Sequence, residues 1–128
     1  MHLEVRQNQD VVILDLKGKL TAGFGDQLLR EAIDELLAEN KHEIVINLSE
    51  VAFLDSAGLG ELVAGLRTAR RFGAELKLLK VSGRVYSTLD MARLLPTFEI
   101  FDDETEAVRS FGAVSYTHLR ALETNESI

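Results

Sequence analysis

The sequence contains no cysteine and no tryptophan, only one proline, and three histidines that lie far apart. The lack of cysteine excludes disulfides and thiolate metal sites, and His2, His42 and His118 have no metal-ligand spacing. No apolar stretch reaches the roughly 18 residues that a membrane span needs. The first ten residues also lack the basic and apolar segments of a signal peptide. We therefore expect a cytoplasmic protein with no metal, no cofactor and no membrane segment.

Positive charge is also scarce, because the chain has 14 Lys and Arg but 21 Asp and Glu, which gives a net charge of −7. Nucleic acids and anionic membranes both select basic surfaces, so we expect neither as a direct partner. The chain has 128 residues, of which 46% are hydrophobic. That is enough for one globular domain with its own core.

The hydrophobic pattern changes period along the chain, which predicts strands alternating with helices. Two runs at the start, HLEVRQ and VVILDLKG, flank the polar NQD and predict a β-hairpin. The second run places Val12 and Leu14 on one face and Val11 and Ile13 on the other, which predicts a strand inside the sheet. Helical spacing then alternates with the short apolar runs EIVINLS, ELKLLKV and FEIF. The third of these helices is expected to end at Pro96, and the fourth to be capped by Asp103. The order β-β-α-β-α-β-α-β-α predicts an α/β fold, a mixed and mostly parallel sheet of about five strands with about four helices.

The last segment, AVSYTHLRALETNESI, holds no sustained hydrophobic period. We assign residues 1–112 to one domain and interpret residues 113–128 as a disordered or non-native tail.

The stretch VAFLDSAGLGEL places an acid, a hydroxyl and two glycines where a predicted strand gives way to a helix. Asp55 or Ser56 is suited to capping that helix, since both side chains accept hydrogen bonds from free backbone N–H groups. Capping leaves Gly58 and Gly60 unexplained, because each glycine weakens a helix by roughly 0.5–1 kcal/mol relative to alanine. Close packing against another element is one explanation, and an opening for a partner is another.

Two functional interpretations of Ser56 compete with simple capping. As a nucleophile it is poorly supported, because Leu54 replaces the first glycine of a nucleophile elbow and His42 is expected at the opposite edge of the sheet. As a phosphate acceptor it would gain roughly −1.5 to −2 charges at pH 7. The positive end of a helix tolerates that charge, whereas a docked partner would have to bury it unpaired. The residues therefore favour a modified serine over a catalytic one.

At these residues the sequence resembles the STAS family, specifically the bacterial anti-anti-sigma factors (anti-sigma factor antagonists). INLSEVAFLDSAGLGEL carries the Asp-Ser-x-Gly core of that family, and the resemblance covers about residues 3–111. It implies a mixed sheet with packed helices, and a protein that has no enzyme activity. It also implies that an anti-sigma factor with serine kinase activity phosphorylates Ser56, and that a serine phosphatase removes the phosphate. The loop around the phosphosite would comprise Asp55, Ala57, Gly58 and Gly60.

A glycine-bearing loop, TAGFG, precedes the first predicted helix. It should lie near Ser56 if neighbouring βα loops share one end of the sheet. It lacks the lysine of a phosphate-binding loop, so we predict a partner-contact surface instead. The residues assigned to that surface are Thr21, Gly23, Phe24 and Leu59. Thr21 and Asn47 stand where many members of the family carry aspartate.

The resemblance implies that the unphosphorylated chain binds an anti-sigma factor and thereby frees a sigma factor. The resemblance also leaves two alternatives open: a non-phosphorylated STAS scaffold subunit of a larger assembly, such as a lipid-transport complex, and a small-molecule-binding STAS domain. Association into a weak homodimer also stays open.

Overall fold

The hairpin predicted at the start of the chain is present in the computed structural model, which describes residues 1–81 and 83–111. β1 (His2–Asn8) and β2 (Val11–Leu20) pair antiparallel in an unbroken register. Gln9, in the turn between them, takes a positive φ of 60°. The predicted tail, residues 113–128, lies outside the described residues.

The strands after β1 run parallel to one another, in the sheet order β1-β2-β3-β4-β5. The described residues hold five strands and four helices, which confirms the predicted α/β architecture. The remaining elements are α1 (Gly25–Ala38), β3 (Glu43–Leu54), α2 (Ser56–Arg71), β4 (Glu75–Leu79), α3 (Gly83–Met91), a 3-10 turn η1 (Leu95–Thr97), β5 (Ile100–Phe101) and a helix over residues 104–111. Among the described helices, none is both long and apolar enough to cross a membrane.

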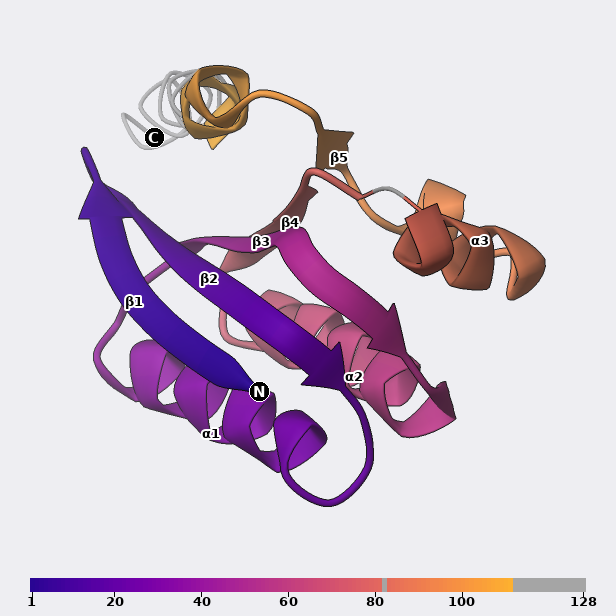
Figure 1. The fold of residues 1–128 in the computed structure, drawn as a ribbon. Helices are drawn as coiled ribbons and strands as arrows, with labels where there is room; N and C mark the ends of the chain where they lie inside the picture. The colour runs from indigo at the N-terminus through magenta and orange to yellow at the C-terminus, as the bar shows by residue number, and fades with distance from the viewer. Residues whose placement is uncertain (82, 112–128) are drawn as a thin grey trace, which may run out of the picture.

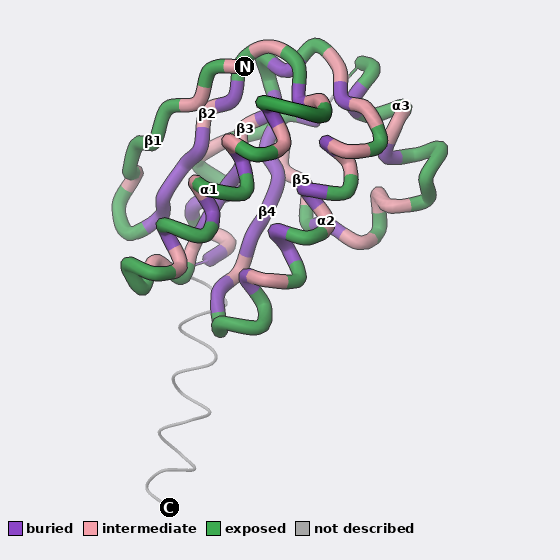
Figure 2. Tube along the Cα trace, turned by 90° about the horizontal axis from the view of Figure 1, so that it is seen from below, coloured by how far each residue is buried: buried purple, intermediate pink, exposed green. Residues whose placement is uncertain are grey.

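The sheet separates two hydrophobic cores. α1 and α2 cover one face, and the helix over residues 104–111 lies on the opposite face (Figure 1). Figure 2 shows buried residues concentrated in β2, β3 and β4. The strand β2 serves both cores, since Val12 and Leu14 join the larger one while Val11 and Ile13 join the smaller. This alternation confirms that β2 lies inside the sheet, as its sequence predicts.

The smaller core contains a buried lysine. Lys77 lies on β4 with 1% of its surface exposed. Its Nζ donates to the Ser110 hydroxyl at 2.8 Å and lies 4.3 Å from the centre of the Phe111 ring. Glu99 approaches the same Nζ at 3.2 Å from the solvent side. The helix over residues 104–111 is therefore fastened to the sheet by polar contacts as well as by apolar packing.

One helix boundary agrees with the sequence prediction and another differs from it. α2 begins at Ser56, directly after Asp55, which is one of the two predicted caps. α3 ends at Met91 and does not continue to Pro96. The N–H of Leu94 donates to the carbonyl of Leu89, and Arg93 takes a positive φ of 60°, so a Schellman-like closure ends α3 before the proline. The predicted Asp103 cap is confirmed, since its Oδ2 accepts the N–H of Glu106 at 3.0 Å.

Candidate functional site

The predicted phosphosite loop and the TAGFG loop leave the same edge of the sheet. β2 and β3 are parallel and end together, with Leu20 opposite Leu54. The backbone N–H of Asp55 donates to the carbonyl of Leu20 at 3.3 Å. The two loops therefore lie side by side at the carboxyl end of the sheet, where open α/β sheets usually bind ligands and partners.

Asp55 ties these two loops together with a single carboxylate. Its Oδ1 accepts the N–H of Gly58 at 2.9 Å, which caps α2. Its Oδ2 accepts the N–H of Ala22 at 3.0 Å, which holds the loop between β2 and α1. The N–H donors of Gly58 and Ala22 lower the pKa of the Asp55 carboxyl, so this group is ionised at neutral pH. The sequence did not decide whether Asp55 or Ser56 caps α2. The geometry assigns the cap to Asp55.

Ser56 is consequently left without a capping role. It is the first residue of α2, it is exposed, and its hydroxyl forms no hydrogen bond with the described residues. His42 directly precedes β3, at the end opposite Ser56. The twelve residues of β3 separate the two side chains by roughly 40 Å at about 3.3 Å per residue. A histidine at that position therefore cannot act as a base for the Ser56 hydroxyl.

The two glycines of the motif have different roles. A Cβ built on Gly58 would lie 2.0 Å from the carbonyl oxygen of Leu20, so α2 can approach the end of β2 only with glycine here. A Cβ built on Gly60 would meet nothing within 4 Å, and Gly60 is exposed. Close packing explains the first glycine. Gly60 lies one helical turn from Ser56, and it has no side chain that would project beside the Ser56 hydroxyl.

The edge that carries Ser56 also carries exposed and half-buried apolar residues. Phe24, which precedes α1, is 64% exposed, and Gly23 next to it is exposed as well. Thr21 and Leu59 are half-buried. An exposed aromatic ring beside small residues is typical of the anchor of a protein interface. The four residues predicted for partner contact thus come from the two loops and the first turn of α2 that meet at this edge.

Asn47 does not belong to this edge. It lies within β3, where its Nδ2 donates to Asp15 Oδ1 at 2.8 Å. Its Oδ1 accepts the N–H of Ser49 at 3.1 Å. An amide at this position serves both partners, because it donates to one and accepts from the other. The departure from aspartate at Asn47 therefore has a local structural explanation.

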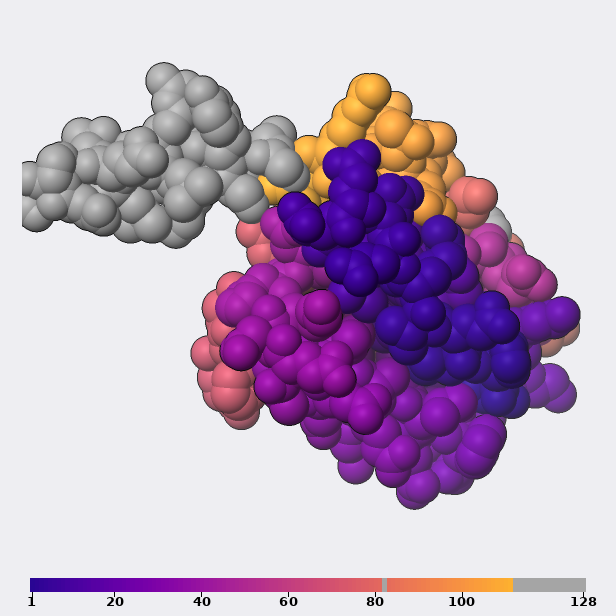
Figure 3. Space-filling view, turned by 90° about the vertical axis from the view of Figure 1, so that its left-hand side faces the viewer, coloured from indigo at the N-terminus to yellow at the C-terminus, as the bar shows by residue number. Residues whose placement is uncertain are grey.

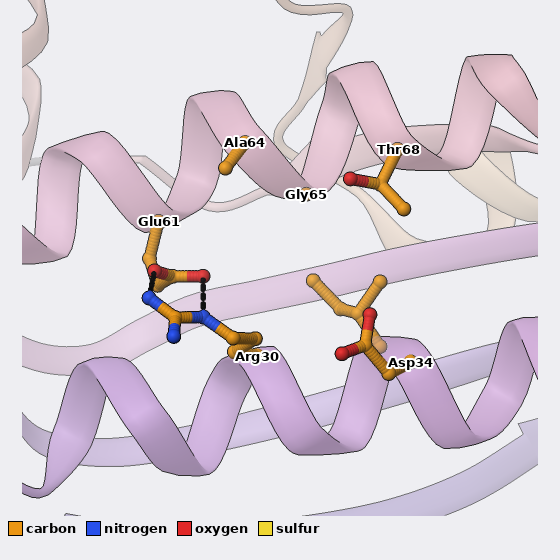
Figure 4. Close-up of a pocket in the computed structure, with 7 residues that line it drawn as sticks. Arg30, Asp34, Glu61, Ala64, Gly65 and Thr68 are labelled. Atoms are coloured by element: carbon orange, nitrogen blue, oxygen red, sulfur yellow. Dashed lines mark hydrogen bonds and ion pairs between the residues drawn. The ribbon is translucent and has the colours of Figure 1, made fainter.

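The structure adds an ion pair that the sequence patterns do not reveal. Arg30 on α1 forms two hydrogen bonds with Glu61 on α2, at 3.1 and 2.6 Å (Figure 4). Glu61 is only 8% exposed. The pair borders a cleft of about 80 Å³ between the helices, where Ile33 faces Gly65. It fixes the first half of α2 relative to α1, and so supports both loops of the site. Nothing in the local sequence links residues 30 and 61, since the contact depends on how the helices pack.

Comparison with known proteins agrees with this geometry. The STAS domain family model matches residues 2–107. This chain belongs to the STAS domain family. The domain is 29% identical to the anti-sigma F factor antagonist of Paenibacillus polymyxa over 90% of this chain and 98% of that protein. It is 30% identical to the anti-sigma-B factor antagonist of Listeria monocytogenes over 81% of this chain and 91% of that protein.

A solved structure extends the comparison to three dimensions. The crystal structure of a candidate anti-sigma factor antagonist from Thermotoga maritima superimposes on this STAS domain with a TM-score of 0.77. The two are 27% identical, and the alignment covers 84% of this chain and 92% of that one. Within residues 1–81 and 83–111 no group of three or more histidines, aspartates or glutamates is placed to hold a metal ion. At this edge the STAS domain exposes the Ser56 hydroxyl and the Phe24 ring.

Proposed function

We propose that this chain is an anti-sigma factor antagonist controlled by phosphorylation of Ser56. In the unphosphorylated state it binds an anti-sigma factor with serine kinase activity, and the sigma factor held by that protein is released. The observation that carries the proposal is the exposed, unbonded hydroxyl of Ser56 at the start of α2, at the edge of the sheet where the loop with the exposed Phe24 ring also lies. The names of the two relatives support the same conclusion.

The local charges explain how one phosphate would act as a switch. A phosphoserine at the first position of α2 lies at the positive end of a helix, so the fold accepts it. The ionised carboxylate of Asp55 is its direct neighbour in the chain and is already held by two backbone N–H groups. A partner that covers this edge would have to bury both negative groups. Reversing a two-state equilibrium from 99:1 to 1:99 needs only about 5.5 kcal/mol, and burying an unpaired charge costs several kcal/mol.

In this mechanism the chain is a substrate and a binding partner, and it performs no catalysis of its own. Asp55 and Gly58 position the two loops, whereas Phe24 and Leu59 supply apolar contact. Ala57, Gly23 and Gly60 leave room for the kinase to reach the hydroxyl. A serine phosphatase returns the phosphorylated form to the binding state. Because sigma factors act on RNA polymerase, the protein would operate in the cytoplasm.

Phosphate mapping tests the site. The full chain is used to capture its anti-sigma factor, and the captured kinase is incubated with the chain and ATP before mass spectrometry. We expect a single phosphate on Ser56, none in Ser56→Ala, and normal labelling of Ser87→Ala, since Ser87 is another exposed helical serine, on α3. Phosphate on another residue, or persistent labelling of Ser56→Ala, would show that the assignment is wrong.

Calorimetry with the same partner tests the switch. We expect Ser56→Asp to remain folded and to bind the anti-sigma factor at least tenfold more weakly, because it adds a negative charge beside Asp55. Ser87→Asp adds the same charge on α3 and should bind like the unmodified chain. Equal affinities for Ser56→Asp and Ser87→Asp would contradict the electrostatic mechanism.

A further inference from the structure

β1 forms an open edge of the sheet. The sheet order places β1 at one edge and β5 at the other. β5 has only two residues, whereas β1 has seven in regular register with β2. Figure 3 faces the β1 side, where the indigo strand lies on the surface above α1. Residues 4–7 are all exposed, although they point alternately to the two faces. Such an edge presents unpaired backbone N–H and C=O groups to another strand.

We propose that β1 pairs antiparallel with β1 of a second copy of this chain, about a twofold axis that passes through Val5. The twofold axis stands perpendicular to the sheet, so residues placed opposite each other must point to the same face. With the axis at Val5, the residue pairs are Val5 with Val5, Glu4 with Arg6, and Leu3 with Gln7. Moving the axis by one residue sets Glu4 against Glu4 or Arg6 against Arg6, which like-charge repulsion disfavours. The charge pattern of β1 thus selects one register.

Val5 supplies the apolar contact at the axis. It pairs with the fully buried Leu14 on β2 and yet is 56% exposed itself. It is one of the few large hydrophobic residues left exposed in the described chain. A second β1 would bring the two Val5 side chains together on the face that α1 covers. The proposed pairing therefore buries the apolar side chain that the monomer leaves open.

The proposed dimer is weak. Two strands of seven residues bury much less than the roughly 1,600 Å² of a standard protein interface. Arg6 is also held by Asp15 and by Glu104 on its own chain, so its pair with Glu4 of the second copy selects the register more than it adds affinity. Ser56 and the loop after β2 do not belong to β1. The dimer is therefore independent of the function proposed above.

Analytical ultracentrifugation over a concentration series tests the interface. We expect a reversible monomer–dimer equilibrium for the full chain, and a dissociation constant at least tenfold higher for Val5→Lys and for Glu4→Arg. Phe72→Lys is the matched control, because Phe72 is 61% exposed at the end of α2 and should dimerise like the unmodified chain. A monomer at every concentration, or equal dimerisation of Val5→Lys and Phe72→Lys, would overturn the proposal. Circular dichroism confirms folding, and Glu4→Arg decides the matter if Val5→Lys does not fold.

Crosslinking tests the register. The chain has no cysteine, so Val5→Cys introduces a single thiol, which the axis places opposite its own copy. Copper–phenanthroline oxidises two such thiols to one disulfide, and we expect a covalent dimer to form at least tenfold faster in Val5→Cys than in Phe72→Cys. Equal rates for the two variants would overturn the proposed register.

Discussion

Alanine substitution of the two motif glycines should change stability in opposite directions. Gly58 and Gly60 lie two residues apart in the first turns of α2, and both are helical. On helix propensity alone, each Gly→Ala change would stabilise the fold by about 0.5–1 kcal/mol. Gly60→Ala should show that gain, because its new methyl group meets nothing within 4 Å.

Gly58→Ala should instead destabilise the protein. Its Cβ would lie 2.0 Å from the carbonyl oxygen of Leu20 and 2.9 Å from the carbonyl carbon. Both atoms are backbone at the end of β2, so the clash can be relieved only by moving α2 away from the sheet. Overpacking of this kind costs about 1–3 kcal/mol or more. That outweighs the propensity gain, and we expect a net loss of about 2 kcal/mol.

Urea unfolding followed by circular dichroism measures both effects. A difference of about 2–3 kcal/mol between Gly58→Ala and Gly60→Ala is the expected result, since it combines the clash with the propensity gain. Equal stability of the two variants would refute the close approach of α2 to Leu20. Calorimetry with the anti-sigma factor then separates stability from function. Gly60→Ala should be the more stable protein and yet the weaker binder, because its methyl group stands beside Ser56.

Substitutions at two further positions, Glu104 and Lys77, test the helix over residues 104–111. The hydrogen bonds from Arg6 lower the pKa of Glu104 from 4.5 to about 2. The ionised carboxylate therefore stabilises the fold above its unfolded pKa. This stabilisation is lost as the pH falls from about 4.5 to about 2. Glu104→Gln should therefore lower the free energy of unfolding by up to about 1 kcal/mol at pH 7 and should match the unmodified chain near pH 2, as measured by urea titration. A difference in stability that stays constant between pH 7 and pH 2 would contradict the stabilising role of the Glu104 carboxylate. Lys77→Met should stay within about 1 kcal/mol of the unmodified chain, while Lys77→Ala should lose about 2–4 kcal/mol through its cavity. Equal losses in thermal unfolding would indicate that the charge of Lys77, and not its volume, stabilises the smaller core.

The elements with strong periodicity could be predicted from the sequence. The alternation of Val11 to Leu14 showed a strand covered on both faces, and the helical spacing of Leu29, Ile33 and Leu36 showed a helix over the main core. Both patterns come from local geometry, because side chains in a strand or a helix meet the core at a fixed period. The end of α3 could not be predicted, since Arg93 takes a conformation that usually marks glycine or asparagine.

The site was predictable in its location but not in its contacts. The Asp-Ser dipeptide at a strand end indicated the position of the candidate site in the fold. Which of the two side chains caps α2 depends on Ala22, because the second oxygen of Asp55 is used by a loop more than thirty residues earlier. The contact of Gly58 with Leu20 is likewise long-range. Contacts of this kind arise only once parallel strands have brought distant loops to one edge.

The helix over residues 104–111 has a consequence for synthesis on the ribosome. It supplies Ala107, Val108 and Phe111, which cover Ile13 and Val45 on the outer face of the sheet. The strands of that face are made before the helix, so the nascent chain carries an uncovered apolar strip until residues 104–111 have been made. A chain released before residue 104 would keep that strip permanently. Premature termination should therefore yield a fragment that chaperones retain or proteases remove, even though it contains the complete Ser56 edge.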